Sequence, residues 1–184
     1  LTIASGDSEQ VAVTFAPAEL GELSDNLLIA HNDPSRGTIF LPMHGLGLGG
    51  ILSASPEALN FRETFVGEAE ELAVELFNDG NIDLTIEDIS AQGEFFNVDF
   101  AGAFDIPPGE SREVMGTFLP ERTGESLGTM IITSSDPFRA VLQVPMGGWG
   151  IDPPVLSVRP DAFDTYLALG EVQDFPIELS NSGG

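Results

Sequence analysis

The sequence predicts an all-β fold made of tandem β-sandwiches, and two observations support this. Apolar and polar residues alternate with a period of two over short stretches, with Gly or Pro between them. Such spacing is typical of sandwiches built from short antiparallel strands. In addition, residues 1–47 align with residues 104–150 at an offset of 103 positions, with many identical residues. A repeat of about a hundred residues is long enough to bury a core of its own.

The repeat divides the chain into three units. Residues 1–50 are predicted to be the C-terminal half of one unit, residues 51–152 a complete unit, and residues 153–184 the N-terminal part of a third. We therefore expect this chain to be a piece of a longer array. Identical pairs at the offset include Val11/Val114, Thr14/Thr117, Phe15/Phe118, Arg36/Arg139 and Met43/Met146.

Seven or eight strands are predicted in the complete unit. The first is expected to be broken into 51–53 and 58–61 around Pro56, because proline is tolerated at a sheet edge. The next strand is predicted at 71–78, and a turn at 78–81 follows it, in which Gly80 is expected to take a positive φ. The remaining strands are predicted at 82–87, 94–100, 111–118, 129–133 and 140–146.

The alternation also predicts which side chains form the core. Each strand places every second residue on the same face, so one parity is buried between the sheets. We assign the thirteen Phe residues chiefly to this core. The core positions expected in the complete unit include Leu72, Val74, Leu76, Val114 and Phe118. The equivalent positions of the third unit, expected to be buried in the same way, are Phe175, Ile177 and Leu179.

The charge is strongly acidic. Thirty Asp and Glu residues stand against six Arg and no Lys, giving a net charge of −24. Such a surface repels polyanions, which argues against nucleic acid and anionic membranes as partners. The acidity is interpreted as an aid to solubility, with binding of divalent cations as the alternative. The absence of Cys excludes disulfides and cysteine-bound zinc, and no apolar run reaches the roughly 20 residues that span a bilayer.

The most repeated short motif is a turn. Asp33 and Pro34, followed by Arg36, are echoed by Asp136 and Pro137, followed by Arg139. An Asp before Pro can accept hydrogen bonds from the backbone that follows it, and Pro fixes φ for a tight turn. We predict structural turns here, because an acid or base role would need a titratable partner that also repeats.

A glycine-rich stretch ends each repeat. Residues 45–50 look superficially like a phosphate loop, but they lack Lys and a following helix, and residues 147–150 are their counterpart. We interpret both as interdomain joints formed by Leu46 and Gly47, and by Trp149 and Gly150. The apolar pair, Leu46 and Trp149, is expected to act as a plug that makes each joint semi-rigid.

No catalytic, cofactor or firm metal site is predicted. His31 and His44 do not repeat and have no His or Cys at ligand spacing. Asp79, Asn81 and Asp83 resemble the alternating oxygens of a calcium loop, but the required Gly and Glu do not follow, so they are only a weak calcium candidate. The complete unit has no His, Lys or Cys to activate a nucleophile, and the chain is not expected to be an enzyme.

An ordered set of motifs resembles a known family. It comprises Val66-Gly67, the Leu76 to Asn81 stretch, the Ile106 to Ser111 turn, Thr117 to Pro120, the Ser-Asp-Pro turn and Val144-Pro145-Met146. The sequence resembles the ASH/Hydin-type immunoglobulin-like repeat, which also occurs in bacterial choice-of-anchor D proteins. That resemblance implies tandem immunoglobulin-like β-sandwiches with no catalytic residues. It implies surface or secreted architecture for bacterial members and cilium-associated scaffolds for eukaryotic ones.

These observations lead to one expected function with open alternatives. We expect a spacer or scaffold in a larger bacterial cell-surface or secreted protein, with neighbouring repeats and an unidentified protein as partners. A cilium-associated cytoplasmic scaffold is less compatible with the acidity, because tubulin is itself acidic. An accessory carbohydrate- or calcium-binding module of an extracellular enzyme would need an aromatic platform, and Trp149 and Tyr166 are the only Trp and Tyr. Exposed half-units at each end are expected to favour head-to-tail association or local disorder.

Overall fold

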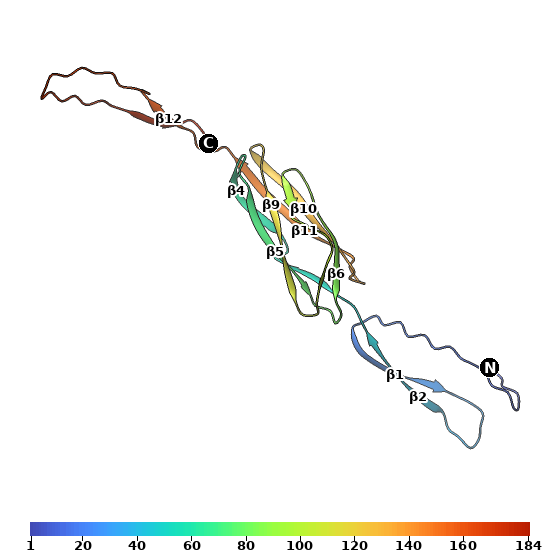
Figure 1. Cartoon of the computed structure of the whole chain (residues 1–184). Coiled ribbons are helices and arrows are strands. Elements are labelled where there is room, and N and C mark those ends of the chain that lie inside the picture. The colour runs from blue at the N-terminus through green and yellow to red at the C-terminus, as the bar shows by residue number, and fades with distance from the viewer.

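The computed structural model describes all 184 residues, and all of its regular elements are β-strands. Figure 1 shows three parts in a row: a central sandwich with one long hairpin extending from each end. The sandwich comprises the strands between Leu52 and Ile151. The predicted all-β, immunoglobulin-like class is confirmed. The structure contains no helix capable of crossing a membrane.

One layer of the sandwich is a five-stranded sheet. Its order is β4-β11-β10-β6-β8, and all neighbours are antiparallel except β4 and β11, which run parallel. Its members are β4 (Leu59–Phe65), β11 (Val141–Ile151), β10 (Gly124–Ser134), β6 (Leu84–Gln92) and β8 (Phe104–Ile106).

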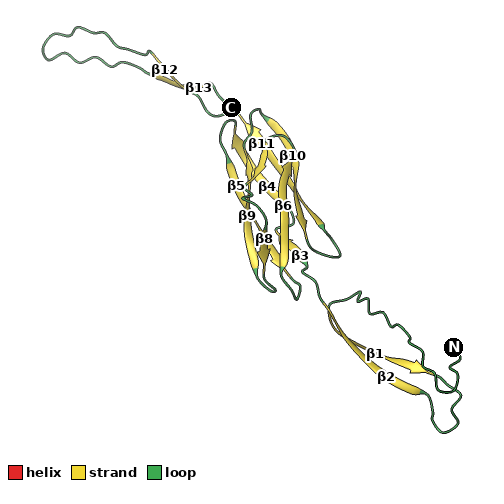
Figure 2. Cartoon of the chain, turned by 45° about the vertical axis from the view of Figure 1, so that its right-hand side comes forward, coloured by secondary structure: helices red, strands yellow, loops and turns green.

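The other layer is a four-stranded antiparallel sheet that packs across the first (Figure 2). Its order is β3-β5-β9-β7, so β3 and β7 form its two edges. Its members are β3 (Leu52–Ser55), β5 (Glu70–Asn78), β9 (Ser111–Phe118) and β7 (Phe96–Val98). The broken first strand at the sheet edge is thus present as β3 and β4, which belong to different sheets.

The sandwich has nine strands, against the seven or eight expected. The additional strand is β8, which has only three residues and therefore too little alternation to be seen in the sequence. Strand β10 begins at Gly124, five residues before the predicted start. Strand β6 begins at Leu84, because the preceding residue pair is still part of the turn whose Ile82 carbonyl accepts a hydrogen bond from Asn78.

A single apolar core lies between the two sheets. Val74, Leu76, Val114 and Phe118 are buried in it as predicted, and Leu72 packs against it half-buried. Phe118 is the largest fully buried side chain, and its ring centroid lies 5.0 Å from that of Phe96. Alternate residues of the strands therefore close two layers, which is the arrangement that period-two patterning specifies.

The terminal hairpins repeat the strand pairing of the sandwich. β1 (Gly21–Ile29) pairs with β2 (Ile39–Gly47) so that Gly21 faces Gly47, just as Gly124 faces Gly150 in β10 and β11. β12 (Leu156–Arg159) pairs with β13 (Glu178–Asn181) so that Leu156 faces Asn181. This matches Leu52 facing Asn78 in β3 and β5. The period of the sequence is therefore also a period of backbone register.

The terminal hairpins do not bury their apolar faces. Phe175, Ile177 and Leu179 are all exposed, so the expectation that they are buried is wrong for this chain. In the sandwich the equivalent residues are covered by the opposite sheet, whereas each terminal hairpin forms a separate two-stranded sheet. Strand alternation predicts which face is apolar, but burial requires a second layer.

Candidate functional site at the joint before the sandwich

The candidate site is the joint between β2 and β3, and Asn78 organises its sandwich side. Asn78 is the last residue of β5 and is buried. Its side-chain amide donates to the carbonyls of Ile82 and Ile106, both at 2.8 Å. Its Oδ1 accepts the N–H groups of Ile51 and Gly80, at 3.1 and 2.9 Å. All four hydrogen-bonding positions of the amide are used, which fixes the turn against the start of the sandwich.

Asn81 extends this turn across the joint. Its Nδ2 donates to the Gly47 carbonyl at 2.8 Å, and its Oδ1 accepts the Gly49 N–H at 3.0 Å. Its own N–H donates to the Gly49 carbonyl at 3.0 Å. Gly47 is the last residue of β2, so Asn81 binds the end of the first hairpin through one hydrogen bond and the linker residue Gly49 through two.

The glycines of the joint allow backbones to approach closely. Gly47, Gly49 and Gly50 are all buried. A Cβ at Gly80 would lie only 2.7 Å from the Cα of Gly50. Gly80 does not have the positive φ that was expected. A glycine is needed at this position because the turn packs directly on the linker backbone, which leaves no room for a side chain.

The joint is not held by the predicted apolar plug. Leu46 is 52% exposed, and Trp149, at the equivalent position, is 49% exposed. Both lie within strands, opposite Glu22 and Glu125 respectively, and both point away from the core side occupied by their neighbours. Of the two glycines predicted at the joints, Gly150 is buried within β11, and the carbonyl of Gly47 accepts a hydrogen bond from Asn81. Polar contacts to the linker backbone therefore take the place of the plug.

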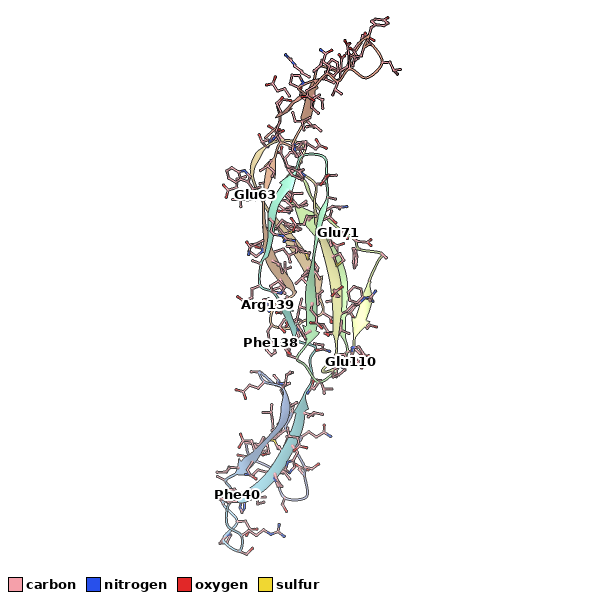
Figure 3. All side chains as sticks on the ribbon, turned by 90° about the vertical axis from the view of Figure 1, so that its left-hand side faces the viewer. Phe40, Glu63, Glu71, Glu110, Phe138 and Arg139 are labelled. Atoms are coloured by element: carbon pink, nitrogen blue, oxygen red, sulfur yellow. The ribbon has the colours of Figure 1, made fainter.

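The turn at Asp136 adds a second set of contacts near this joint. The Asp136 carboxylate is buried, and its Oδ1 accepts the N–H groups of Phe138 and Arg139. Its Oδ2 accepts the Leu52 N–H at 2.9 Å, and the Arg139 guanidinium donates to the Leu52 carbonyl at 2.6 Å. Figure 3 shows Phe138 and Arg139 at the end of the sandwich that faces the first hairpin. The predicted turn therefore also binds the backbone of Leu52, the first residue of β3.

The equivalent turn at Asp33 has only local contacts. Its Oδ1 accepts from the Ser35 N–H and hydroxyl, at 2.8 and 2.6 Å. Hydrogen bonds from the Ser35 hydroxyl and then the Ser35 N–H hold the pKa of Asp33 below its ordinary value; desolvation opposes them, and the nearby His31 adds a lesser lowering effect. Pro34 follows as Pro137 follows Asp136. The two turns share their local geometry, but only the turn at Asp136 also binds the first strand of a unit.

The calcium candidate is dispersed over other roles. Asp79 accepts a hydrogen bond from the Ser53 hydroxyl at 2.6 Å, and both polar atoms of the Asn81 amide bind the linker. The Asp83 side chain makes no hydrogen bond with Asp79 or Asn81. Across the chain, no group of three or more His, Cys, Asp or Glu side chains is arranged to hold a metal ion. His31 and His44 lie on the first hairpin and its turn.

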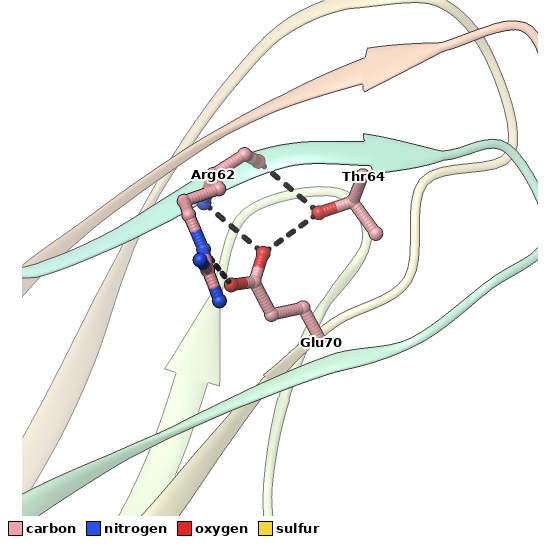
Figure 4. Close-up of polar contacts among 3 residues, drawn as sticks. All are labelled: Arg62, Thr64 and Glu70. Atoms are coloured by element: carbon pink, nitrogen blue, oxygen red, sulfur yellow. Dashed lines mark hydrogen bonds and ion pairs between the residues drawn. The ribbon is translucent and has the colours of Figure 1, made fainter.

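A polar cluster that the sequence did not reveal ties the two sheets together at their open edge (Figure 4). Glu70, the first residue of β5, accepts the Arg62 N–H at 3.0 Å and the Thr64 hydroxyl at 2.9 Å. The Arg62 Nε lies 3.3 Å from the other carboxylate oxygen. Arg62 and Thr64 belong to β4 in the opposite sheet. Both carboxylate oxygens therefore make structural contacts with the opposite sheet.

The fold places this chain in the class of immunoglobulin-like β-sandwich proteins. Residues 52–134, less than half of the chain, match a family described as Transmembrane protein 131-like N-terminal. No curated protein sequence matches the chain significantly. A protein of unknown function from Porphyromonas gingivalis W83 is similar in structure, with a TM-score of 0.50 and 16% identity. That match covers 73% of this chain and 68% of the other, and it shows a shared fold.

The ASH/PapD-like domain of human CEP192 (PapD-like domain 7) is another similar structure. It has a TM-score of 0.49 and 16% identity, over 67% of this chain and 99% of that domain. The similar structures thus include an ASH-type domain, the kind of repeat that the sequence resembles.

Proposed function

We propose that this chain is a non-enzymatic spacer and interaction module that holds successive immunoglobulin-like repeats of a larger protein at a set angle. The observation that carries the proposal is the contact of Asn81 with Gly47 and Gly49. A flexible linker needs no such contact, whereas a joint that keeps one orientation must resist bending. Each hydrogen bond contributes about 1 kcal/mol, so three of them favour one orientation over many.

The second joint offers an internal comparison. At the offset of 103, the position of Asn81 is taken by Gly184, which lies against Asp152 as Asn81 lies against Gly49. Glycine has no side chain that could bind the preceding strand. The proposal therefore implies a stiff first joint and a looser second one.

We place this spacer in a bacterial cell-surface or secreted protein. The support is the acidic surface and the sequence resemblance to choice-of-anchor D proteins. Its partners in this proposal are the neighbouring repeats and a further protein. A carbohydrate-binding role has less support, because Trp149 lies in β11 while Tyr166 lies in the loop between β12 and β13.

Electron–electron distance measurements between two spin labels test the proposal directly. The chain has no Cys, so Ser24→Cys in the first hairpin and Ser90→Cys in the sandwich give two unique labelling sites. Both positions are exposed. We expect a narrow distance distribution for this pair, and a clearly broader one after Asn81→Ala.

Two controls accompany this experiment. Asn97→Ala removes an exposed asparagine from the edge strand β7 and is expected to leave the distribution unchanged. Labels at Ser90 and Ser180 span the second joint and are expected to give a broader distribution than the first pair. A first-joint distribution as broad as that of the second, and insensitive to Asn81→Ala, would refute the spacer function.

A further inference from the structure

The outer face of the five-stranded sheet carries the only Trp of the chain. Leu127 of β10 is 70% exposed, and Val141 and Trp149 of β11 are 46% and 49% exposed. Pro145 and Gly147 lie on the same face of β11 between Val141 and Trp149, and Gly147 faces Leu127 on β10. These five residues form the outer strip, an apolar surface that no element of the sandwich covers.

The repeat itself does not require this strip. At the offset of 103, Leu127 corresponds to Ser24 and Val141 to Thr38, so both positions are polar in the first repeat. Ser24 lies within β1 and pairs with β2 in the register that Leu127 has with β11. The hairpin therefore forms without an apolar residue at that place, and the strip of the sandwich points to a contact outside the fold.

The exposure of Trp149 is a property of its place in the unit. Leu46 occupies the equivalent position in the first repeat, where a complete sandwich follows it, and Leu46 is still 52% exposed. A complete following unit therefore leaves this position open. Leu127 and Val141 belong to the complete unit and also point away from its core, so the outer strip does not depend on a neighbouring repeat.

Two carboxylates flank Trp149. The register places Glu125 of β10 on one side of it and Glu63 of β4 on the other, and all three side chains are exposed on the outer face. Side chains directly opposite one another on neighbouring strands have Cβ atoms about 5 Å apart. A negative charge therefore borders the indole ring on each side.

No cation of the chain occupies this place. The ion pairs of the chain involve Glu70 and Glu94, so Glu63 and Glu125 have no cationic partner. The two arginines that stack on aromatic rings lie over phenylalanines, and none lies over Trp149. An indole ring is the aromatic surface that attracts a cation most strongly. The two carboxylates and a net charge of −24 add to this attraction, so the charge of the strip is complementary to a basic partner.

The strip also has room for an apolar side chain beside the cation. A Cβ at Gly147 would meet only the Leu127 side chain, at 3.6 Å, so the surface above this glycine is open. Gly147 lies two residues before Trp149 on β11, and alternate residues of a strand are about 7 Å apart. An extended peptide has the same spacing between its own alternate side chains.

We infer that the outer strip binds a partner protein through an extended segment in which an Arg or Lys stands two residues from an apolar residue. The cation lies on Trp149 between Glu63 and Glu125, and the apolar side chain lies on Leu127 and Gly147. This inference rests on the proposed interaction module and gives the chemistry of its further protein partner. Apolar contact in the centre with charge at the border is the usual composition of a protein interface.

NMR titration of the full chain with a synthetic peptide tests the inference. The probe is acetyl-Thr-Arg-Thr-Leu-Thr-amide, and Trp149 supplies the only indole N–H signal of the chain. We expect this signal to shift with peptide concentration and the affinity to fall as NaCl is raised. Replacement of the Arg of the probe by Gln should weaken binding at least about fivefold, because it removes the cation.

Paired substitutions separate a built site from attraction to the whole acidic surface. Glu63→Gln/Glu125→Gln should weaken binding of the Arg peptide at least about fivefold. The matched control is Glu71→Gln/Glu113→Gln, which removes the same charge from exposed positions on the opposite sheet and should weaken binding less than about twofold. Figure 3 labels Glu63 and Glu71, which lie on strands of different sheets.

Two further variants test the apolar part of the strip. Trp149→Ala should abolish binding, followed by the backbone N–H signal of Gly147. Leu127→Ser introduces the residue of the first repeat, and it should weaken binding of the probe but leave binding of the analogue in which Thr replaces Leu unchanged.

Equal weakening by the two Gln pairs would overturn the inference, because it would show attraction to the net charge alone. Equal affinity for the Arg and Gln peptides, or no shift of the indole signal, would also overturn it. A shift with cellohexaose but not with the Arg peptide would identify a carbohydrate surface instead. The spin-label distances report only on the joints, so each of these failures leaves the spacer function standing.

Discussion

Phe15 and Phe118 occupy the same position of the repeat, yet Phe118 is fully buried and Phe15 is 53% exposed. Each ring lies against a glycine of the neighbouring hairpin, Phe15 against Gly45 and Phe118 against Gly148. The difference arises because Phe118 is also covered by the rings of Phe61 and Phe96, whereas Phe15 has no aromatic neighbour. We predict that Phe118→Ala lowers the free energy of unfolding by about 3–5 kcal/mol, as for other buried Phe residues. Phe15→Ala should lower it by less than about 1 kcal/mol. Urea unfolding followed by circular dichroism distinguishes the two; equal losses would contradict the assignment of the core.

Asn78→Ala should be among the most destabilising polar substitutions in the chain. It removes four hydrogen bonds and leaves the N–H of Ile51 and the carbonyl of Ile106 without their side-chain partner. Leaving such buried groups unpaired costs about 1–3 kcal/mol each, so we expect a loss of about 3 kcal/mol or more. The exposed Asn97→Ala is the control and should change stability by less than about 0.5 kcal/mol. Similar unfolding midpoints for the two variants would contradict this role of Asn78.

Asp136 and Arg139 should be energetically coupled, because both bind the peptide groups of Leu52. We predict that a double-mutant cycle of Asp136→Ala and Arg139→Ala gives a coupling energy of about 1 kcal/mol. The repeat supplies the control: Asp33→Ala with Arg36→Ala should leave the midpoint of urea unfolding nearly unchanged and show no coupling. Additive effects at Asp136 and Arg139 would contradict the predicted coupling and mean that the two contacts with Leu52 act independently.

The turn at Asp33 should depend on pH. Hydrogen bonds from Ser35 lower the pKa of Asp33, so the ionised carboxylate favours the ordered turn. A group whose pKa is lowered on folding stabilises the fold above its unfolded pKa, and this contribution is lost as pH falls through the folded pKa. We predict that carboxyl NMR titration finds the Asp33 pKa below its ordinary value and that Ser35→Ala raises it. A pKa unaffected by Ser35→Ala would exclude the hydroxyl as the main cause.

Much of the sandwich could be predicted from local sequence. Alternation alone identified Val74, Leu76, Val114 and Phe118 as buried, because strand geometry sends every second side chain to the same face. Strand β8 was missed because three residues are too few to show a period. The exposure of Ile177 agrees with the exposed half-units that the repeat predicted and not with the alternation, because alternation within one strand does not report whether a second layer is present.

The candidate site was only partly predictable. Asp136 was recognised as a turn residue, since Asp-Pro has a local conformational preference. Its contact with Leu52 spans 84 residues, and no local pattern encodes it. The sequence signal for this contact was the arginine repeated at Arg36 and Arg139, because a turn alone does not require an arginine at the same place in two repeats. Asn81 was read as a weak calcium ligand, whereas its amide binds a linker that comes more than thirty residues earlier in the chain.

The central claim is that the first hairpin and the sandwich have one fixed relative orientation. Residual dipolar couplings of backbone N–H groups measure this most directly, by comparing the alignment tensor of Gly21–Gly47 with that of Leu52–Ile151. The account predicts tensors of equal magnitude and common axes in the unmodified chain, and a reduced hairpin tensor after Asn81→Ala. A hairpin tensor already much smaller than that of the sandwich in the unmodified chain would contradict it.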